Sequence, residues 1–294
     1  MSTNNIPRPR VACEVSVERV VAARAAEKLP ALESATAQEL PSGALTPGLQ
    51  QTNLAARQSI VDALRETLSV VSGRSRDVVL VIPDATTRVI LLEFDTLPDK
   101  HEDADGVVRF RLKKSLPFDV DQSAVSFDRQ ASGDGLRLIA AVTPRAVLQE
   151  YESAVREAGY NPGTIMPSMI AALGAVDATQ PTMVIKVESG TTTFAIADRD
   201  QLLLYRALEN GGATVTGDSL VDDVNSSLVY FEDRYQLTVE RLLVSGVQSG
   251  QALQVAFSDR AVKVEELVSA SLAGAAASNV SRFALAGVAG ALVS

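Results

Sequence analysis

Three short segments lie where an expected hairpin or strand end could face a cleft. Their sequences are CEVS at 13–16, KVESGTTT at 186–193 and LLVSGV at 242–247. Each places small or hydroxyl-bearing residues at the end of an expected strand, and such turns let backbone N–H groups approach an anion. Ser, Gly and Thr are also ordinary turn residues, so a simple strand-to-strand turn is the alternative interpretation of SGTT at 189–192.

The sequence offers little for other kinds of catalysis. It has one His, one Cys and no Trp among 294 residues. His101 lies among acidic residues without a partner motif, which nearly excludes zinc hydrolases, metal oxygenases and Ser-His-Asp enzymes. Cys13 cannot form an internal disulfide, and we expect it to be a small buried hydrophobe. We therefore expect no catalytic residue and no metal site.

The chain is acidic, with 27 Lys and Arg against 36 Asp and Glu and a net charge of −9. A chain of this charge is repelled by phosphate backbones, so we expect no nucleic-acid partner. No signal peptide or membrane span is recognisable, and the apolar run 283–294 has a length that suits a buried helix. We expect a cytoplasmic protein.

Hydrophobic patterning predicts an α/β chain in which one arrangement occurs twice. In the first half we expect two short strands from Val11 with a turn at Glu18-Arg19, and then mainly loop, with one strand, over 29–53. A helix is expected from about Asn53, which can cap it, and a buried strand over 77–83. The second half starts again, with strands expected over 183–187, 191–197, 201–208 and 241–244 and a helix over 219–235. This recurrence indicates an internal duplication.

The stretch over 98–122 interrupts the first arrangement. It is acidic at first and then amphipathic as far as Pro117. Its apolar side chains either pack on the main sheet, the commoner use of such a stripe, or form a groove for an extended or turn-forming peptide. Strands are expected over 123–131 and 136–143, with a hairpin turn at Asp134-Gly135.

The basic residues of this stretch also allow two interpretations. They either form a solvated helix face, or contact anionic lipid head groups or an acidic partner beside a membrane. The residues are Arg109, Arg111, Lys113 and Lys114.

Two resemblances give these patterns a fold and a function. A hairpin at the start of each half, with a glycine turn late in the second, resembles the actin-like ATPase superfamily. The segment 97–130 resembles the PilM family of type IV pilus assembly proteins. The features that carry this resemblance are an amphipathic helix over 109–116, Pro117-Phe118, an acidic turn and a strand over 124–127. That resemblance extends from about Val11 to Val293. It implies an α/β, bilobal actin-like fold with a small inserted subdomain in the first lobe.

The resemblance also implies a division of the chain. The expected parts are a flexible tail at 1–10, a first lobe at 11–178 with the inserted subdomain at about 97–143, a second lobe at 179–279, and a C-terminal helix at 280–294 that packs back on the first lobe.

The function that the resemblance implies is that of a cytoplasmic scaffold at the inner face of the inner membrane, in the type IV pilus assembly platform that serves twitching motility. Such proteins bind the N-terminal cytoplasmic peptide of the membrane protein PilN. Other pilus platform proteins are further expected partners, and membrane association is expected to be peripheral, through partners. The expected peptide-binding residues are Phe110, Leu112, Leu116, Pro117 and Phe118.

The phosphate-binding motifs of that fold are altered here. In the first hairpin the family's magnesium-side Asp aligns with Glu14 and its Gly with Ser16. In the second hairpin the same two positions carry Lys186 and Glu188. Two unit charges about 4 Å apart at an effective dielectric near 20 repel by roughly 4 kcal/mol, so Glu188 opposes phosphate binding. In the third turn Val247 follows Gly246, and its isopropyl group would crowd a nucleoside.

A degenerate nucleotide cleft without hydrolysis is therefore expected, and alternatives remain open. Lys186 could bind a phosphate directly as a point charge. If ATP with magnesium binds, the expected contacts are Glu14, Ser16, Lys186, Ser189, Gly190, Thr191, Thr192 and Gly246. An active ATPase or sugar-type kinase, a platform protein of type II secretion and a filament-forming protein are the alternative functions.

Overall fold

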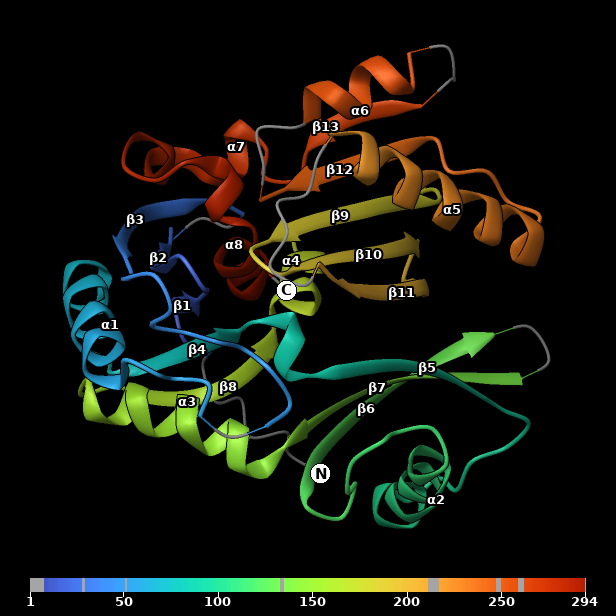
Figure 1. Cartoon of the computed structure of the whole chain (residues 1–294), viewed down its shortest axis with the longest axis horizontal. Coiled ribbons are helices and arrows are strands. Elements are labelled where there is room, and N and C mark those ends of the chain that lie inside the picture. The colour runs from blue at the N-terminus through green and yellow to red at the C-terminus, as the bar shows by residue number, and fades with distance from the viewer. Residues whose placement is uncertain are drawn as a thin grey trace.

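The computed structural model describes residues 8–27, 30–50, 52–132, 135–210, 217–246, 250–258 and 262–293. Within them the chain forms two five-stranded mixed sheets, one from each half of the sequence, and a separate three-stranded sheet (Figure 1). The α/β class and the bilobal architecture expected from the sequence are confirmed.

The first sheet has the strand order β3-β2-β1-β4-β8. β1, β2 and β3 form an antiparallel meander, whereas β4 and β8 run parallel to β1. Helices α1 (Arg57–Val71) and α3 (Arg145–Glu157) cover one face and bury a shared apolar cluster. The strands are β1 (Val11–Val15), β2 (Arg19–Ala25), β3 (Leu32–Glu39), β4 (Asp77–Ile82) and β8 (Asn161–Pro167).

The second sheet repeats this arrangement, with the order β11-β10-β9-β12-β13. Its first three strands are again antiparallel and its last two again run parallel to the first. Helices α5 (Gly217–Tyr235) and α6 (Gly250–Ala256) pack on its outer face. The strands are β9 (Thr182–Glu188), β10 (Thr191–Asp198), β11 (Gln201–Glu209), β12 (Arg241–Ser245) and β13 (Lys263–Glu266). The duplication predicted from the sequence is thus visible in topology.

A subdomain is inserted between β4 and α3. It contains the 3-10 turn η1 (Asp84–Thr86), β5 (Arg88–Phe94), α2 (His101–Lys113), β6 (Ser123–Ser132) and β7 (Gly135–Pro144). The strand order is β5-β7-β6, and α2 packs through Val108 and Leu112 on this sheet, whereas the packing alternative from the sequence named the main sheet. The two strands predicted at 123–131 and 136–143 are confirmed. Asp134, expected in the hairpin turn, lies outside the described residues.

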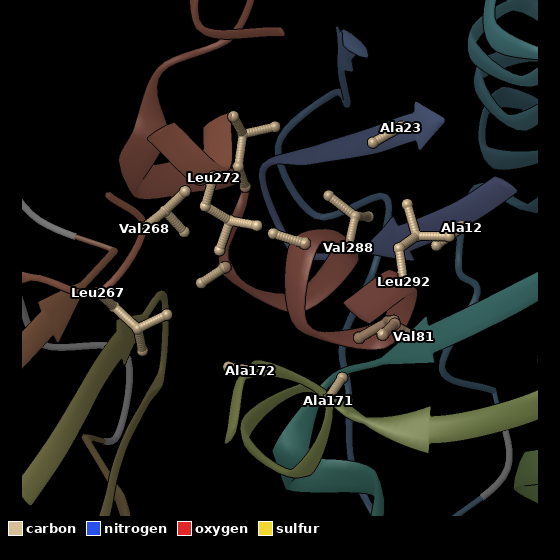
Figure 2. Close-up of a cluster of buried hydrophobic side chains, with 14 of the residues drawn as sticks. Ala12, Ala23, Val81, Ala171, Ala172, Leu267, Val268, Leu272, Val288 and Leu292 are labelled. Atoms are coloured by element: carbon tan, nitrogen blue, oxygen red, sulfur yellow. The ribbon is translucent and has the colours of Figure 1, made fainter. Parts of the chain in front are cut away.

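Two short helices fill the space between the large sheets. They are α4 (Ser168–Leu173) and α8 (Ala286–Val293), and Figure 2 shows Val288 and Leu292 of α8 beside Ala12 and Val81 of the first sheet. The same cluster includes residues of the second sheet, so α8 is buried on nearly every side. This position explains why the end of the chain is so apolar. No helix in the described ranges has the length and hydropathy that crossing a membrane requires.

The segment that leads to α8 lies beside the first sheet and connects the two lobes. It comprises α7 (Ala270–Ala273), η2 (Gly274–Ser278) and η3 (Arg282–Ala284), and η2 contacts β3. The helix expected over 280–293 is therefore shorter, and a 3-10 turn precedes it.

The expected cap of α1 needs correction, whereas the strand expected before it is present. Asn53 does not cap α1, which begins after Ala56 without a side-chain cap. The Asn53 Oδ1 atom instead accepts the Gly48 N–H at 2.7 Å, so this acceptor serves the loop. The one strand expected within 29–53 is confirmed as β3, an eight-residue strand at the edge of the first sheet.

Candidate functional site

Two equivalent strand ends bring Glu14 and Lys186 together between the lobes. Glu14 is near the end of β1, opposite Val81 of β4, and Lys186 is near the end of β9, opposite Ser245 of β12. The Lys186 Nζ lies 3.1 Å from the Glu14 Oε1, and both side chains are only 7% exposed. The two positions that were expected, from the resemblance, to correspond to magnesium-side Asp residues thus form an ion pair with each other.

Glu188 supplies a second carboxylate to the same ammonium group. It follows Lys186 by two residues on β9 and forms an ion pair with it. Burial lowers the pKa of Lys186, but the nearby carboxylates of Glu14, Glu188 and Asp84 outweigh this effect and raise the pKa overall. Lys186 therefore stays charged at neutral pH, as a permanent internal cation where a bound magnesium ion would need a carboxylate.

Asp84 completes the cluster, and the sequence analysis missed it. It is fully buried in η1, directly after β4. Its carboxylate accepts the Met169 N–H at 2.9 Å, the Thr193 hydroxyl at 3.0 Å and the Tyr205 hydroxyl at 3.3 Å. Burial, followed by Glu188, raises the pKa of Asp84 from 3.8 to about 7. An Asp directly after a buried apolar strand, in DVVLVIPD, was the signal available in the sequence.

Helices α4 and α8 close the remaining sides of the Glu14 carboxylate. Ser168, at the start of α4, donates its hydroxyl hydrogen bond to the Glu14 Oε1 atom. Gly287, in the first turn of α8, lies so close that a Cβ there would overlap the carboxylate of Glu14. The space around Glu14 is consequently filled by protein atoms.

The SGTT segment forms the turn between β9 and β10. Gly190 has a φ of +88°, a value that favours glycine, and its carbonyl accepts the Asn210 N–H at 2.8 Å. The side-chain amide of Asn210 donates to the Thr192 hydroxyl at 3.0 Å. Thr191 and Thr192 are buried, whereas Ser189 is exposed. The strand-to-strand turn, which was the alternative interpretation, accounts for all of these contacts.

Ser16 and Gly246 also have local roles. The Ser16 hydroxyl donates to the Arg19 carbonyl at 2.9 Å and closes the turn between β1 and β2. Gly246 has a φ of +91°, and a Cβ there would overlap the Val187 carbonyl. Glycine is needed at this position because β12 ends close against the backbone of β9 and leaves no space for a side chain. Val247, the residue expected to crowd a nucleoside, lies outside the described residues.

The expected peptide-binding residues divide into two groups. Phe110 is 64% exposed on α2, with the Lys114 Nζ 4.5 Å from its ring centroid, and Pro117 is also exposed. Leu112 is fully buried in the subdomain core, and Leu116 and Phe118 pack against that core. The expectation for Leu112 is therefore corrected, because it supports the subdomain and presents no surface to a partner.

The basic face of α2 is partly neutralised. Arg109 pairs with Asp105 at 2.7 Å, and Lys113 pairs with Asp121 at 2.7 Å. Within the described ranges no ion pair forms with Arg111 or Lys114, and Arg111 lines an open pocket at the ends of β5 and β7.

His101 has a structural contact. Its ring stacks on Phe127 of β6, with the ring centroids 4.8 Å apart. Among the described residues no group of His, Cys, Asp and Glu is arranged to hold a metal ion.

Comparison with known proteins places this geometry in a fold family. No family model matches the sequence, and no curated protein matches it. A solved structure described as the PilM-PilN type IV pilus biogenesis complex has a chain that matches with a TM-score of 0.75 and 16% identity, over 97% of each chain. A Bacteroides thetaiotaomicron protein described as having an actin-like ATPase fold and unknown function matches with a TM-score of 0.51 and 10% identity, over 87% of this chain and 89% of that one. The chain has the actin-like ATPase fold.

Another structure with this fold belongs to a membrane-associated machine. The cytoplasmic domain of EpsL, an inner-membrane component of the type II secretion system of Vibrio cholerae, matches with a TM-score of 0.52 and 10% identity. The match covers 89% of this chain and 98% of that domain. At such low identities these likenesses establish the fold alone, and it is the actin-like fold that the resemblance implied.

Proposed function

We propose that the chain is a scaffold of a type IV pilus assembly platform, located in the cytoplasm at the inner face of the inner membrane. The observation that carries this proposal is the likeness to a chain of the PilM–PilN complex over 97% of both chains, with a TM-score of 0.75. The resemblance of 97–130 to the PilM family, read from the sequence alone, supports it independently. The EpsL likeness supports the broader statement that this fold serves inner-membrane assemblies.

The partner we propose is the N-terminal peptide of a PilN-like membrane protein, bound at the inserted subdomain. Phe110 and Pro117 are the exposed members of the expected contact set, and the half-buried Leu116 and Phe118 border them. An exposed aromatic ring gains most when a partner covers it, because its apolar area then leaves water. Other platform proteins are further partners, and the protein associates with the membrane peripherally through them.

The nucleotide cleft, in this proposal, is inactive. The Lys186 ammonium is bound by Glu14 and Glu188, so a phosphate would have to displace a buried ion pair. Asp84 adds a third acidic group to the same site. Clustered carboxylates repel phosphates strongly in a buried setting, and the residues that the structure describes hold no group of ligands arranged for a metal ion. We therefore propose a scaffold without ATP hydrolysis, in contrast to an active ATPase or kinase.

A titration with variants tests the partner and its site. The full chain is titrated calorimetrically with the N-terminal peptide of the PilN-like protein from the same organism, as wild type, as Phe110→Ala and as Val255→Ala. Val255 is an equally exposed apolar residue, on α6 of the second lobe, and serves as the matched control. We expect at least about a tenfold loss of affinity for Phe110→Ala, equivalent to about 1.4 kcal/mol, and no loss for Val255→Ala. Equal affinities for all three proteins would place the peptide elsewhere, and no binding by wild type would remove the pilus assignment.

A further inference from the structure

The buried cluster between the lobes contains more negative than positive charge. The carboxylates of Glu14, Glu188 and Asp84 face one ammonium, that of Lys186. Lys186 forms ion pairs with the carboxylates of Glu14 and Glu188. Asp84 receives hydrogen bonds from neutral donors and no direct ion pair among the described residues. Of the three carboxylates, Asp84 is thus the one whose negative charge is least compensated by a nearby cation.

Asp84 also joins the two lobes. It belongs to the first half of the chain, at the end of β4, whereas Thr193 and Tyr205 belong to β10 and β11 of the second sheet. Met169, its third donor, is in α4 between the sheets. Asp84 and the Glu14–Lys186 pair are therefore two contacts across the same junction.

We propose that Asp84 is a proton-linked clasp, which holds the two lobes closed when it carries a proton and loosens them when it loses the proton. The neutral form can keep its contacts, because a protonated Oδ2 can donate to the Thr193 hydroxyl while Oδ1 still accepts from Met169 and Tyr205. The ionised form places a further negative charge beside Glu188 in a dry interface. This inference does not depend on the proposed function, and its test uses no partner.

The charged and polar groups around Asp84 determine the pH range in which it loses its proton. Glu188 disfavours ionisation, whereas Lys186 and the donors Met169 and Thr193 favour it. Burial, and then Asp84 itself, raises the pKa of Tyr205 well above its usual value, so that Tyr205 stays neutral. Arg88, the cation near Tyr205, pairs with Glu209 at 2.9 Å. With the pKa of Asp84 raised to about 7, the proton is lost as the pH rises through the neutral range.

The distance between the lobes gives the direct test. Cysteines are introduced at Val70 on α1 and Val255 on α6, which are 68% and 70% exposed and lie in different lobes (Figure 1). Cys13 is buried, so dyes react at the introduced sites. Single-molecule energy transfer between the dyes is then recorded from pH 6 to pH 8. We expect one narrow distance distribution at pH 6 and a broader or shifted one at pH 8.

Two variants and a control assign this change to Asp84. Asp84→Asn should keep the pH 6 distribution at every pH, whereas Asp95→Asn, which alters an exposed carboxylate, should behave as wild type. Thr193→Val preserves the shape of the side chain but removes a donor that favours ionisation, so the midpoint should move to higher pH. The proposal is overturned if the wild-type distribution is the same at both pH values. A pH response that persists unchanged in Asp84→Asn or Thr193→Val would overturn it as well.

Discussion

Lys186→Met is the substitution that tests the buried cluster most severely. At the observed Nζ–Oε1 distance of 3.1 Å, two unit charges at an effective dielectric of 20 attract by about 5 kcal/mol. Removing one partner of a buried pair typically costs about 3–5 kcal/mol, because the other charge is left without compensation. Here two carboxylates lose their cation, so we expect a cost of at least about 3 kcal/mol in the free energy of unfolding.

Equilibrium unfolding in guanidinium chloride at pH 7.5 measures this cost. The matched control is Lys263→Met, because Lys263 is on a strand of the second sheet and pairs with Glu265 while 73% exposed. An exposed pair of this kind contributes at most about 1 kcal/mol. A second comparison is the double variant Glu14→Gln/Lys186→Met, which should be less destabilised than the sum of its single variants. If Lys186→Met costs no more than Lys263→Met, the ion-pair cluster does not hold the lobes together.

Other predictions follow from single positions. Gly287→Ala should lower the free energy of unfolding by roughly 2 kcal/mol or more, because the new Cβ would overlap the Glu14 carboxylate. Gly106→Ala should instead stabilise the chain by about 0.5–1 kcal/mol, because a Cβ there meets open space on α2 and alanine favours a helix. Thermal and denaturant unfolding check both, and the reverse order would contradict the packing described for α8. Cys13 should resist a thiol reagent at pH 8 until urea unfolds the chain, because burial, followed by Glu14, raises its pKa to about 12; rapid reaction of the native protein would contradict this. The pKa of Asp84 is raised from 3.8 to about 7 in the folded state, so the stability that its proton contributes is fully present below pH 3.8 and is lost as the pH rises through 7. The equilibrium constant for unfolding should therefore rise about tenfold from pH 6 to pH 8. No such rise should occur in Asp84→Asn.

The sequence predicted those parts of the fold that depend on local pattern. The apolar runs of β4 and β9 and the hairpins that open each half lie close to where they were expected, whereas α2 begins and ends earlier than the helix expected over 109–116. Strand alternation and helical periodicity report which residues are buried, and both halves repeat the same pattern. The duplicated topology could therefore be predicted from the sequence alone.

Contacts between distant segments were not predictable in this way. Asn53 has a side chain suited to capping, but its acceptor is used by Gly48. Leu112 belongs to an apolar stripe, and periodicity alone cannot say whether a sheet or a partner covers it. Asp84 becomes part of the site only because β10, β11 and α4 meet there.

The pairing of Glu14 with Lys186 shows the same limit. The sequence placed both residues in the cleft and treated their charges as obstacles to magnesium and phosphate. The structure adds that the two side chains neutralise each other, 3.1 Å apart, across the junction of the lobes. The sequence signal for such a pair is a charge reversal at one of two equivalent positions. This signal can be interpreted only when the fold shows that the two positions lie together.

In the function that we propose, this chain binds a partner peptide and its cleft does not respond to nucleotide. The most direct measurement is a calorimetric titration of the wild-type chain with the N-terminal peptide of the PilN-like protein from the same organism, with and without Mg-ATP. We predict peptide binding with the same dissociation constant in both conditions and no heat from Mg-ATP alone. Binding that tightens with Mg-ATP, or Mg-ATP binding in the low micromolar range, would contradict the role assigned to Lys186 and its carboxylates.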